Sequence, residues 1–110
     1  MIEGIKSISF IRKSLGKSEF KIVNDNGLYI YINNKKIEIS KEEMLYFSDN
    51  FFRIIDNWEK EYIDNGGIDF ENWELLINYS DNTNKRYYGK GKYPDNFGAL
   101  ENLILEFMSK

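Results

Sequence analysis

The stretch "WELLINYSDNTNKRYYGKG", Trp73 to Gly91, decides the fold class. Its first half alternates apolar and polar residues, and this period of two predicts a strand that directs one face inward. That face carries Trp73, Leu75, Ile77 and Tyr79. The segment "SDNTN" then forms a turn, and "KRYYGKG" returns as the partner strand of a hairpin. Antiparallel strands are therefore expected in the sheet.

The first forty residues predict three or four further strands with the same period of two. The segments are "IKSISFIRK" from Ile5, then "EFKIVN", "LYIYIN" and the short "KIEI". In the first of them, Ile8 and Phe10 share one face, whereas Ile5 and Ile11 interrupt the alternation. "NDNG" and "NNKK" separate the later segments, and both are typical of turns, since glycine in "NDNG" can adopt a positive φ without steric cost.

A change of period at Ser40 predicts a long helix. "SKEE" places Glu43 three residues after Ser40, which is the spacing of a reciprocal capping box. Apolar residues then follow at helical spacing, and the helix is expected to continue to about Ile63. Its apolar stripe comprises Phe47, Phe51, Ile54, Ile55, Trp58 and Tyr62. "DNGG", residues 64–67, is expected to end the helix.

A terminal helix completes the predicted domain. After Pro94 and an expected Asp95 cap, "NFGALENLILEFM" carries apolar residues at helical spacing. The order β-β-β-(β)-α-β-β-α predicts one α+β domain over residues 1–110, in which helices cover one face of an antiparallel sheet of five to six strands. Phe51, Ile55, Ile77 and Leu103 are expected to share its interior.

The C-terminal half resembles an uncharacterised group of small proteins from Gram-positive bacteria. The shared pattern is a "W-x-L-x-I-x-Y" strand followed by "G-x-G-x-YP-x-NF" and a terminal helix. The matching residues are Trp58, Asp69, Trp73, Leu75, Ile77, Tyr79, Gly89, Tyr93, Pro94, Asn96 and Phe97. The resemblance spans Trp58 to about Phe107, and it implies an architecture without implying any catalytic residue.

Composition argues against most catalytic chemistry. The chain has 110 residues, a formal net charge of −3, and neither histidine nor cysteine. It therefore lacks the commonest general base, the commonest nitrogen ligand for metals, and the thiol nucleophile. We expect a protein that is not an enzyme and binds no cofactor or metal. No apolar segment is long enough to span a membrane and no secretory signal is recognisable, so a soluble, cytoplasmic protein is expected.

An acidic segment between Asp56 and Glu74 is the first candidate binding site. Most charge runs are solvated surfaces, and "DNGGIDFE" lacks the ligand alternation of a calcium loop. As a functional site, the segment would contact a basic surface on another protein. The candidate residues are Glu59, Glu61, Asp64, Asp69 and Glu71.

The hairpin "RYYGKGKYPDNF" is the second candidate site. Gly89, Gly91 and Pro94 have obvious roles in bending and ending a strand, so backbone geometry accounts for most of the stretch. The alternative is a nucleic-acid surface in which cations contact phosphates and rings stack on bases. Its candidate residues are Arg86, Tyr88, Lys90 and Lys92. "GKGK" does not have the order of a phosphate-binding loop.

These features together predict a small protein-binding inhibitor or immunity-type protein of a phage or bacterial conflict system, with anti-CRISPR-like inhibitors as one instance. Its partner would be a protein with a basic surface. The alternative is a nucleic-acid-binding module that uses the basic hairpin. It ranks second because the chain as a whole is acidic. A homodimer formed through an unpaired sheet edge is the third possibility.

Overall fold

The computed structural model of the chain describes residues 4–14, 16–64 and 71–109, which contain seven strands and two helices. The strands are β1 (Ile5–Lys13), β2 (Lys17–Asn24), β3 (Leu28–Ile32), β4 (Lys35–Glu38), β5 (Glu61–Ile63), β6 (Asn72–Tyr79) and β7 (Asn84–Lys90). The helices are α1 (Lys41–Ile55) and α2 (Phe97–Met108). Asparagine takes the left-handed conformation in three of the turns between strands, at Asn26, Asn33 and Asn82, where φ is 52°, 53° and 70°.

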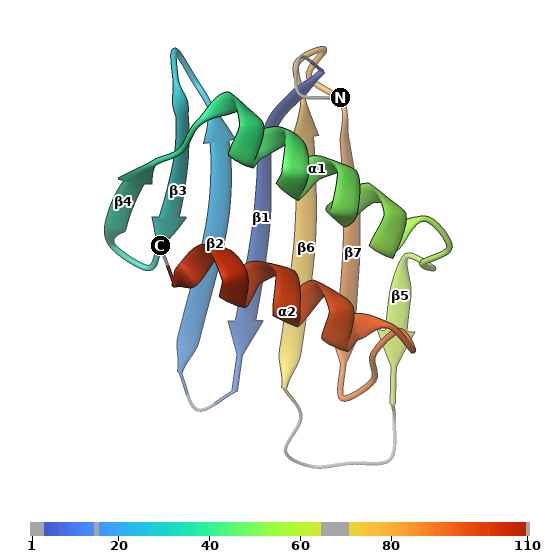
Figure 1. Cartoon of the computed structure of the whole chain (residues 1–110). Helices are drawn as coiled ribbons and strands as arrows, with labels where there is room; N and C mark the ends of the chain where they lie inside the picture. Colours follow the sequence, from blue (N-terminus) through green and yellow to red (C-terminus); the bar gives the residue numbers. More distant parts are fainter. Residues whose placement is uncertain (1–3, 15, 65–70, 110) are drawn as a thin grey trace.

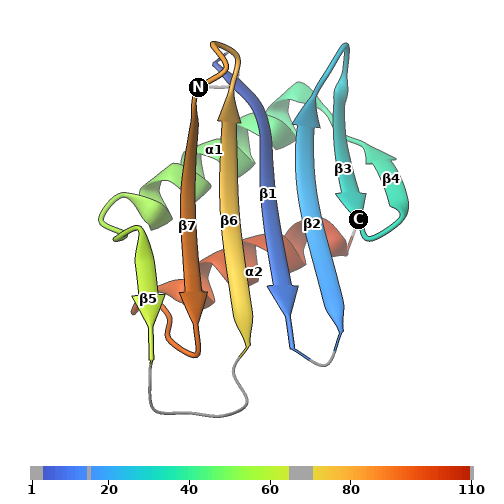
Figure 2. The same ribbon diagram turned by 180° about the vertical axis from the view of Figure 1, so that it is seen from behind.

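All seven strands form one sheet in the order β4-β3-β2-β1-β6-β7-β5. Neighbouring strands are antiparallel, except that β5 runs parallel to β7. Figure 1 shows α1 and α2 crossing the same face of the sheet, and Figure 2 shows the opposite face without a helix on it. The predicted α+β class and the one-sided helical layer are therefore confirmed, and the sheet has more strands than the expected five to six.

Helix α1 begins where the sequence predicts. The Ser40 side chain accepts a hydrogen bond from the Glu43 amide at 3.0 Å, and Glu43 Oε1 accepts from the Ser40 amide at 2.9 Å. Both bonds satisfy amide donors that a helix N-terminus otherwise leaves without partners.

The predicted end of this helix near Ile63 is wrong. α1 ends at Ile55, and residues 61–63 form β5, whose edge pairing with β7 supplies the hydrogen bonds that a longer helix would have made internally. The Tyr88 amide donates to the Lys60 carbonyl, and the Asp64 amide donates to the Lys90 carbonyl, both at 3.0 Å. Pairing with another strand therefore overrides the helical spacing of the apolar residues. The "DNGG" stop signal lies mostly outside the described residues.

The core lies between the sheet and the two helices. Phe51, Ile55, Ile77 and Leu103 are all buried in one cluster, as predicted. Ile5 also reaches this core, because the register between β1 and β6 shifts between Ile5 and Ser7. Such a bulge inserts one residue and returns the following side chains to the expected faces. The bulge explains the position of Ile5, whereas Ile11 lies on the opposite face of the strand, in register with Glu19 and Glu74.

Trp73 is the centre of an aromatic cluster at the β5 side of the core. Its indole packs against Phe97, with ring centroids 5.0 Å apart, and against Trp58 at 5.8 Å. The ring lies directly over Gly89, where a Cβ atom would be 2.5 Å from the indole Cε2 and 2.6 Å from the Lys92 carbonyl oxygen. Trp73 Nε1 donates to that same oxygen at 2.9 Å. Glycine is therefore required at this position for steric reasons.

Asn96, rather than the predicted Asp95, occupies the N-cap position of α2, and its side chain makes no capping bond. Its side chain instead connects the two helices. Asn96 Oδ1 accepts from Trp58 Nε1 at 2.6 Å, and Asn96 Nδ2 donates to the Ile54 carbonyl at 2.7 Å. The last turn of α1 is thereby joined to the first turn of α2.

The steric role of Gly89 predicts that Gly89→Ala lowers the free energy of unfolding by about 1–3 kcal/mol, the usual cost of overpacking a core. Urea denaturation measures this loss. Gly98→Ala is the matched control, because a Cβ built at Gly98 in α2 has no atom within 4 Å other than those of its chain neighbours and its own helical backbone. Because Gly98 lies in the first turn of α2, alanine there is expected to leave stability unchanged or to raise it by less than about 1 kcal/mol. Equal stability of the two variants would contradict the steric role.

Candidate functional site

The predicted acidic segment does not form one continuous ridge. Glu71 is held by Arg12, Glu61 Oε2 accepts from the Tyr88 hydroxyl at 2.5 Å, and Glu59 is exposed. Asp64 follows β5, and Asp69 lies outside the described residues. Glu61 and Glu71, and also Glu74 at the end of the segment through Arg86, thus have partners within the protein.

The predicted basic hairpin is divided between two surfaces. Arg86, Tyr88 and Lys90 alternate along β7 and project from the face of the sheet opposite the helices. Lys92 lies beyond the end of β7 and lines a hollow of about 360 Å³ together with Trp58 and Asn96. The structure therefore brings together three of the four predicted residues.

The two candidate sites meet at the β5–β7 edge of the sheet. The Tyr88 hydroxyl donates to Glu61, and this hydrogen bond raises the pKa of Tyr88. Arg86 forms an ion pair with Glu74 and lies over the Tyr88 ring, 4.4 Å from its centroid. Acidic and basic residues that are separate in the sequence thus form one surface of mixed charge.

We call the helix-free side of the sheet the open face, and cross-strand pairing identifies its residues. Its charged members are Lys13, Lys17, Glu19, Lys21, Lys36, Glu38, Glu61, Glu74, Arg86 and Lys90. Six cations against four carboxylates give this face a net charge of +2. Tyr29, Tyr31 and Tyr88 lie among them, and the Lys36 ammonium is 4.1 Å from the Tyr29 ring centroid.

The two helices form an acidic layer on the other side of the molecule. Within residues 41–55 and 97–108, five carboxylates oppose two cations, a net charge of −3. The carboxylates are Glu42, Glu43, Asp49, Glu101 and Glu106. The Tyr46 hydroxyl donates to Glu106 Oε2 at 2.8 Å, so a ring and a carboxylate from different helices lie together on this layer.

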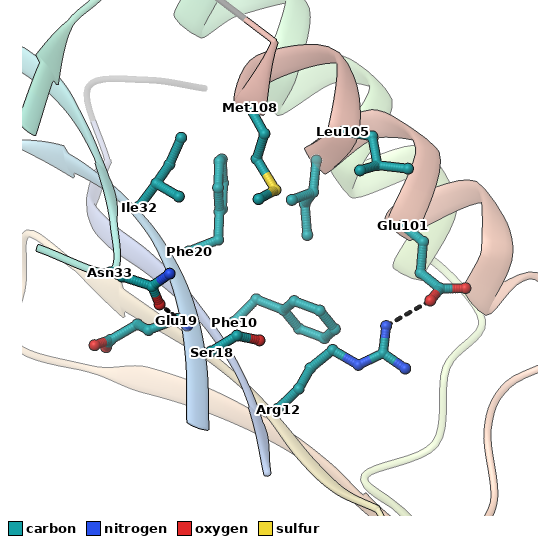
Figure 3. Close-up of a pocket in the computed structure, with 11 residues that line it drawn as sticks. Phe10, Arg12, Ser18, Glu19, Phe20, Ile32, Asn33, Glu101, Leu105 and Met108 are labelled. Atoms are coloured by element: carbon teal, nitrogen blue, oxygen red, sulfur yellow. Dashed lines mark hydrogen bonds and ion pairs between the residues drawn. The ribbon is translucent and has the colours of Figure 1, made fainter. Parts of the chain in front are cut away.

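A groove lies between α2 and the strands β1–β3 (Figure 3). Its volume is about 210 Å³. Its lining comprises Phe10, Arg12, Ser18, Glu19, Phe20, Ile32, Asn33, Glu101, Ile104, Leu105 and Met108. The Arg12–Glu101 ion pair closes one end, and Figure 3 shows the Glu19 carboxylate directed away from the groove.

Arg12 on β1 forms ion pairs with Glu71, which precedes β6, and with Glu101 on α2. Its Nε and Nη2 donate to the two oxygens of Glu71 at 2.9 and 2.5 Å, and its Nη1 donates to Glu101 Oε2 at 2.5 Å. Partial burial acts to raise the pKa of Glu71, but hydrogen bonds from Arg12 and Tyr93 outweigh it, so the pKa lies below its ordinary value. Burial and the bond to Glu71 together raise the pKa of Tyr93. The Glu71 carboxylate is therefore held in place by hydrogen bonds from Arg12 and Tyr93.

Comparison of the chain with protein-family models, with curated proteins and with solved structures found no match. The resemblance to the Gram-positive group therefore stays a prediction. Its motif nevertheless has a structural explanation here, since Trp73 packs on Gly89, Tyr93 donates to Glu71, and Asn96 connects the helices.

Over residues 4–14, 16–64 and 71–109, no group of three acidic side chains is arranged to hold a metal ion. Within the same residues, neither helix is long and apolar enough to cross a membrane. The structure adds two surfaces that sequence analysis missed, namely the acidic layer and the groove. Glu101 and Glu106 on the predicted terminal helix were a visible signal for the first. The groove had none, because its walls come from separate segments.

The Glu71 network predicts a pH-dependent contribution to stability. Because its pKa in the folded protein is below the ordinary 4.5, the stabilisation is complete above that pH and is lost as pH falls through the folded value. Glu71→Gln should therefore cost about 1.5–3 kcal/mol near neutral pH, and the difference from wild type should shrink below about pH 4.5. Urea denaturation across pH measures both effects.

Glu59→Gln is the control for this prediction, because Glu59 is an exposed carboxylate of the same acidic segment. It should change stability by less than about 0.5 kcal/mol. A Glu71→Gln variant whose stability deficit is the same at pH 3 and pH 7 would show that Glu71 contributes no charge-dependent stabilisation.

Proposed function

We propose that this protein is a small non-enzymatic protein-binding module of the inhibitor or immunity type, which recognises a basic surface on another protein through its acidic layer. The supporting observation is the difference in charge between the two helices and the open face. The acidic layer carries −3 and the open face +2. A basic surface is attracted to one side and repelled by the other, which favours a single docking orientation.

The acidic layer is better suited to this role than the acidic segment. Its five carboxylates lie on two neighbouring helices, whereas the described members of the acidic segment are divided between the open face, which carries Glu61, and the Arg12 network, which holds Glu71. The layer also presents Tyr46, which is 49% exposed. Interfaces between proteins are enriched in tyrosine, and charged side chains commonly surround the apolar part.

The biological setting that we propose is a phage or bacterial conflict system, in which the acidic layer covers a cationic surface that otherwise holds nucleic acid. Anti-CRISPR-like inhibitors are one instance of this mode of action. In this proposal the chain needs no catalytic group, because covering the surface is itself the inhibitory act.

The acidic layer can be tested by neutralising Glu42, Asp49 and Glu106 with Glu42→Gln, Asp49→Asn and Glu106→Gln. These positions leave the Ser40 capping box and the Arg12 network intact. A partner captured from bacterial lysate by the wild-type chain should bind the triple variant about tenfold more weakly, since each charge contributes about 0.5 kcal/mol. Isothermal titration with the isolated partner measures the change.

The matched control removes three cations from the open face with Lys17→Gln, Lys21→Gln and Lys36→Gln. This variant should keep the affinity of the wild type for the partner. Equal losses in the two variants would contradict docking on the acidic layer, as would a partner whose affinity depends only on the open face.

A second candidate function, nucleic-acid binding, is favoured by one observation: the open face collects Arg86, Tyr88 and Lys90 with four further lysines and two further tyrosines. Cations and rings on a sheet can contact phosphates and stack on bases. We place this function second because four carboxylates alternate with the cations, and carboxylates repel phosphates.

Nucleic-acid binding is tested by titrating single-stranded oligonucleotides at increasing salt. Phosphate contacts give a linear fall of log affinity with log salt, and the open-face triple variant should reduce that slope by about 2. Fluorescence anisotropy is a suitable measurement. Absence of binding at 20 mM salt would eliminate this candidate.

A further inference from the structure

The groove between α2 and β1–β3 has an exposed apolar wall. Leu105 is 56% exposed and Met108 is 44% exposed, and they are two of the five large apolar side chains that are exposed in the described part of the chain. Opposite them lie Phe20 and Ile32, so that apolar groups face one another across the groove (Figure 3). Methionine is flexible and adapts its shape to a partner, which suits it to a binding surface.

The size of the groove limits what can occupy it. Its volume of about 210 Å³ is below the roughly 300–1,000 Å³ that is usual for small-molecule and cofactor sites. One large aliphatic or aromatic side chain is a more suitable occupant. Such an anchor residue, inserted from a partner, is a common energetic centre of protein interfaces.

The charges at one end of the groove indicate which type of residue would lie beside this anchor in the partner protein. Arg12 contributes one positive charge, whereas Glu71 and Glu101 contribute two negative charges, so the network is negative overall. The Glu101 side chain is 40% exposed and therefore accessible from the groove. A lysine or arginine beside the anchor would complement this excess charge.

We propose that the groove binds one large apolar side chain of the partner protein, adjacent to a lysine or arginine that contacts Glu101. This inference rests on the proposed function, because it names the segment by which a basic partner is held. It goes beyond that function by assigning the contact to the side of α2 that borders β1–β3.

Synthetic nonapeptides test the groove directly. The probe has a central leucine or tryptophan with two lysines on each side, and its counterparts have a central serine or glutamates in place of the lysines. In 1H–15N NMR titrations the lysine-flanked apolar peptides should shift the amides of Phe20, Asn33, Leu105 and Met108 in a saturable manner. The serine and glutamate counterparts should bind at least fivefold more weakly.

Variants of the full chain locate the binding. Leu105→Ser should weaken the leucine peptide at least fivefold, and Glu101→Gln should reduce the preference for lysine over glutamate flanks. Leu45→Ser is the matched control, since Leu45 is a 41% exposed leucine on α1 that does not line the groove. Thermal unfolding of each variant verifies that it is folded. Shifts confined to other surfaces, or unaffected by Leu105→Ser, would overturn the proposal.

The two proposals can fail separately. If the isolated partner loses affinity when the acidic layer is neutralised but not when Leu105 is replaced, and the peptides do not occupy the groove, the groove inference alone fails. If the peptides occupy the groove but no captured partner depends on the acidic layer, the proposed function alone fails.

Discussion

The packing of Trp73 on the backbone of Gly89 is the contact on which the rest of the structure depends. The missing Cβ allows a large ring to lie flat on β7 and to donate to the Lys92 carbonyl, so its polar atom is satisfied inside the core. Trp58, which follows α1, Tyr62 from β5 and Phe97 from α2 then pack around this ring. One contact between neighbouring strands thereby fixes the position of both helices.

Local signals in the sequence were sufficient for most of the fold, but not for the end of α1. The start at Ser40 was predictable because the capping box requires only residues within one helical turn. The end was not, because Trp58 and Tyr62 are four residues apart and suit one face of a helix. Here they face the same cluster by a different geometry, since Tyr62 pairs with Gly89 in the parallel strand β5. Pairing partners that distant in sequence are not visible in a local period.

For the candidate sites too, some residue placements were predictable from the sequence and others were not. Arg86, Tyr88 and Lys90 share one face because they alternate along β7, and a period of two is visible in the sequence. Lys92 departs from them because Gly91 has a φ of 68°, which turns the chain away from β7. Glu59, Glu61 and Glu71 were grouped because they are close in the sequence. In the structure, the pairing of β5 with β7 places Glu61 on the open face, whereas Arg12 holds Glu71 beside Glu101. The distribution of charge on the surface depends on which strands are neighbours, so it could not be predicted without the order of strands in the sheet.

The acidic layer and the open face carry opposite net charges. Interactions of these charges with other molecules are screened beyond about 8 Å at physiological ionic strength and beyond about 30 Å in 10 mM salt. A charged partner should therefore distinguish the acidic layer from the open face more strongly in dilute buffer than at physiological salt.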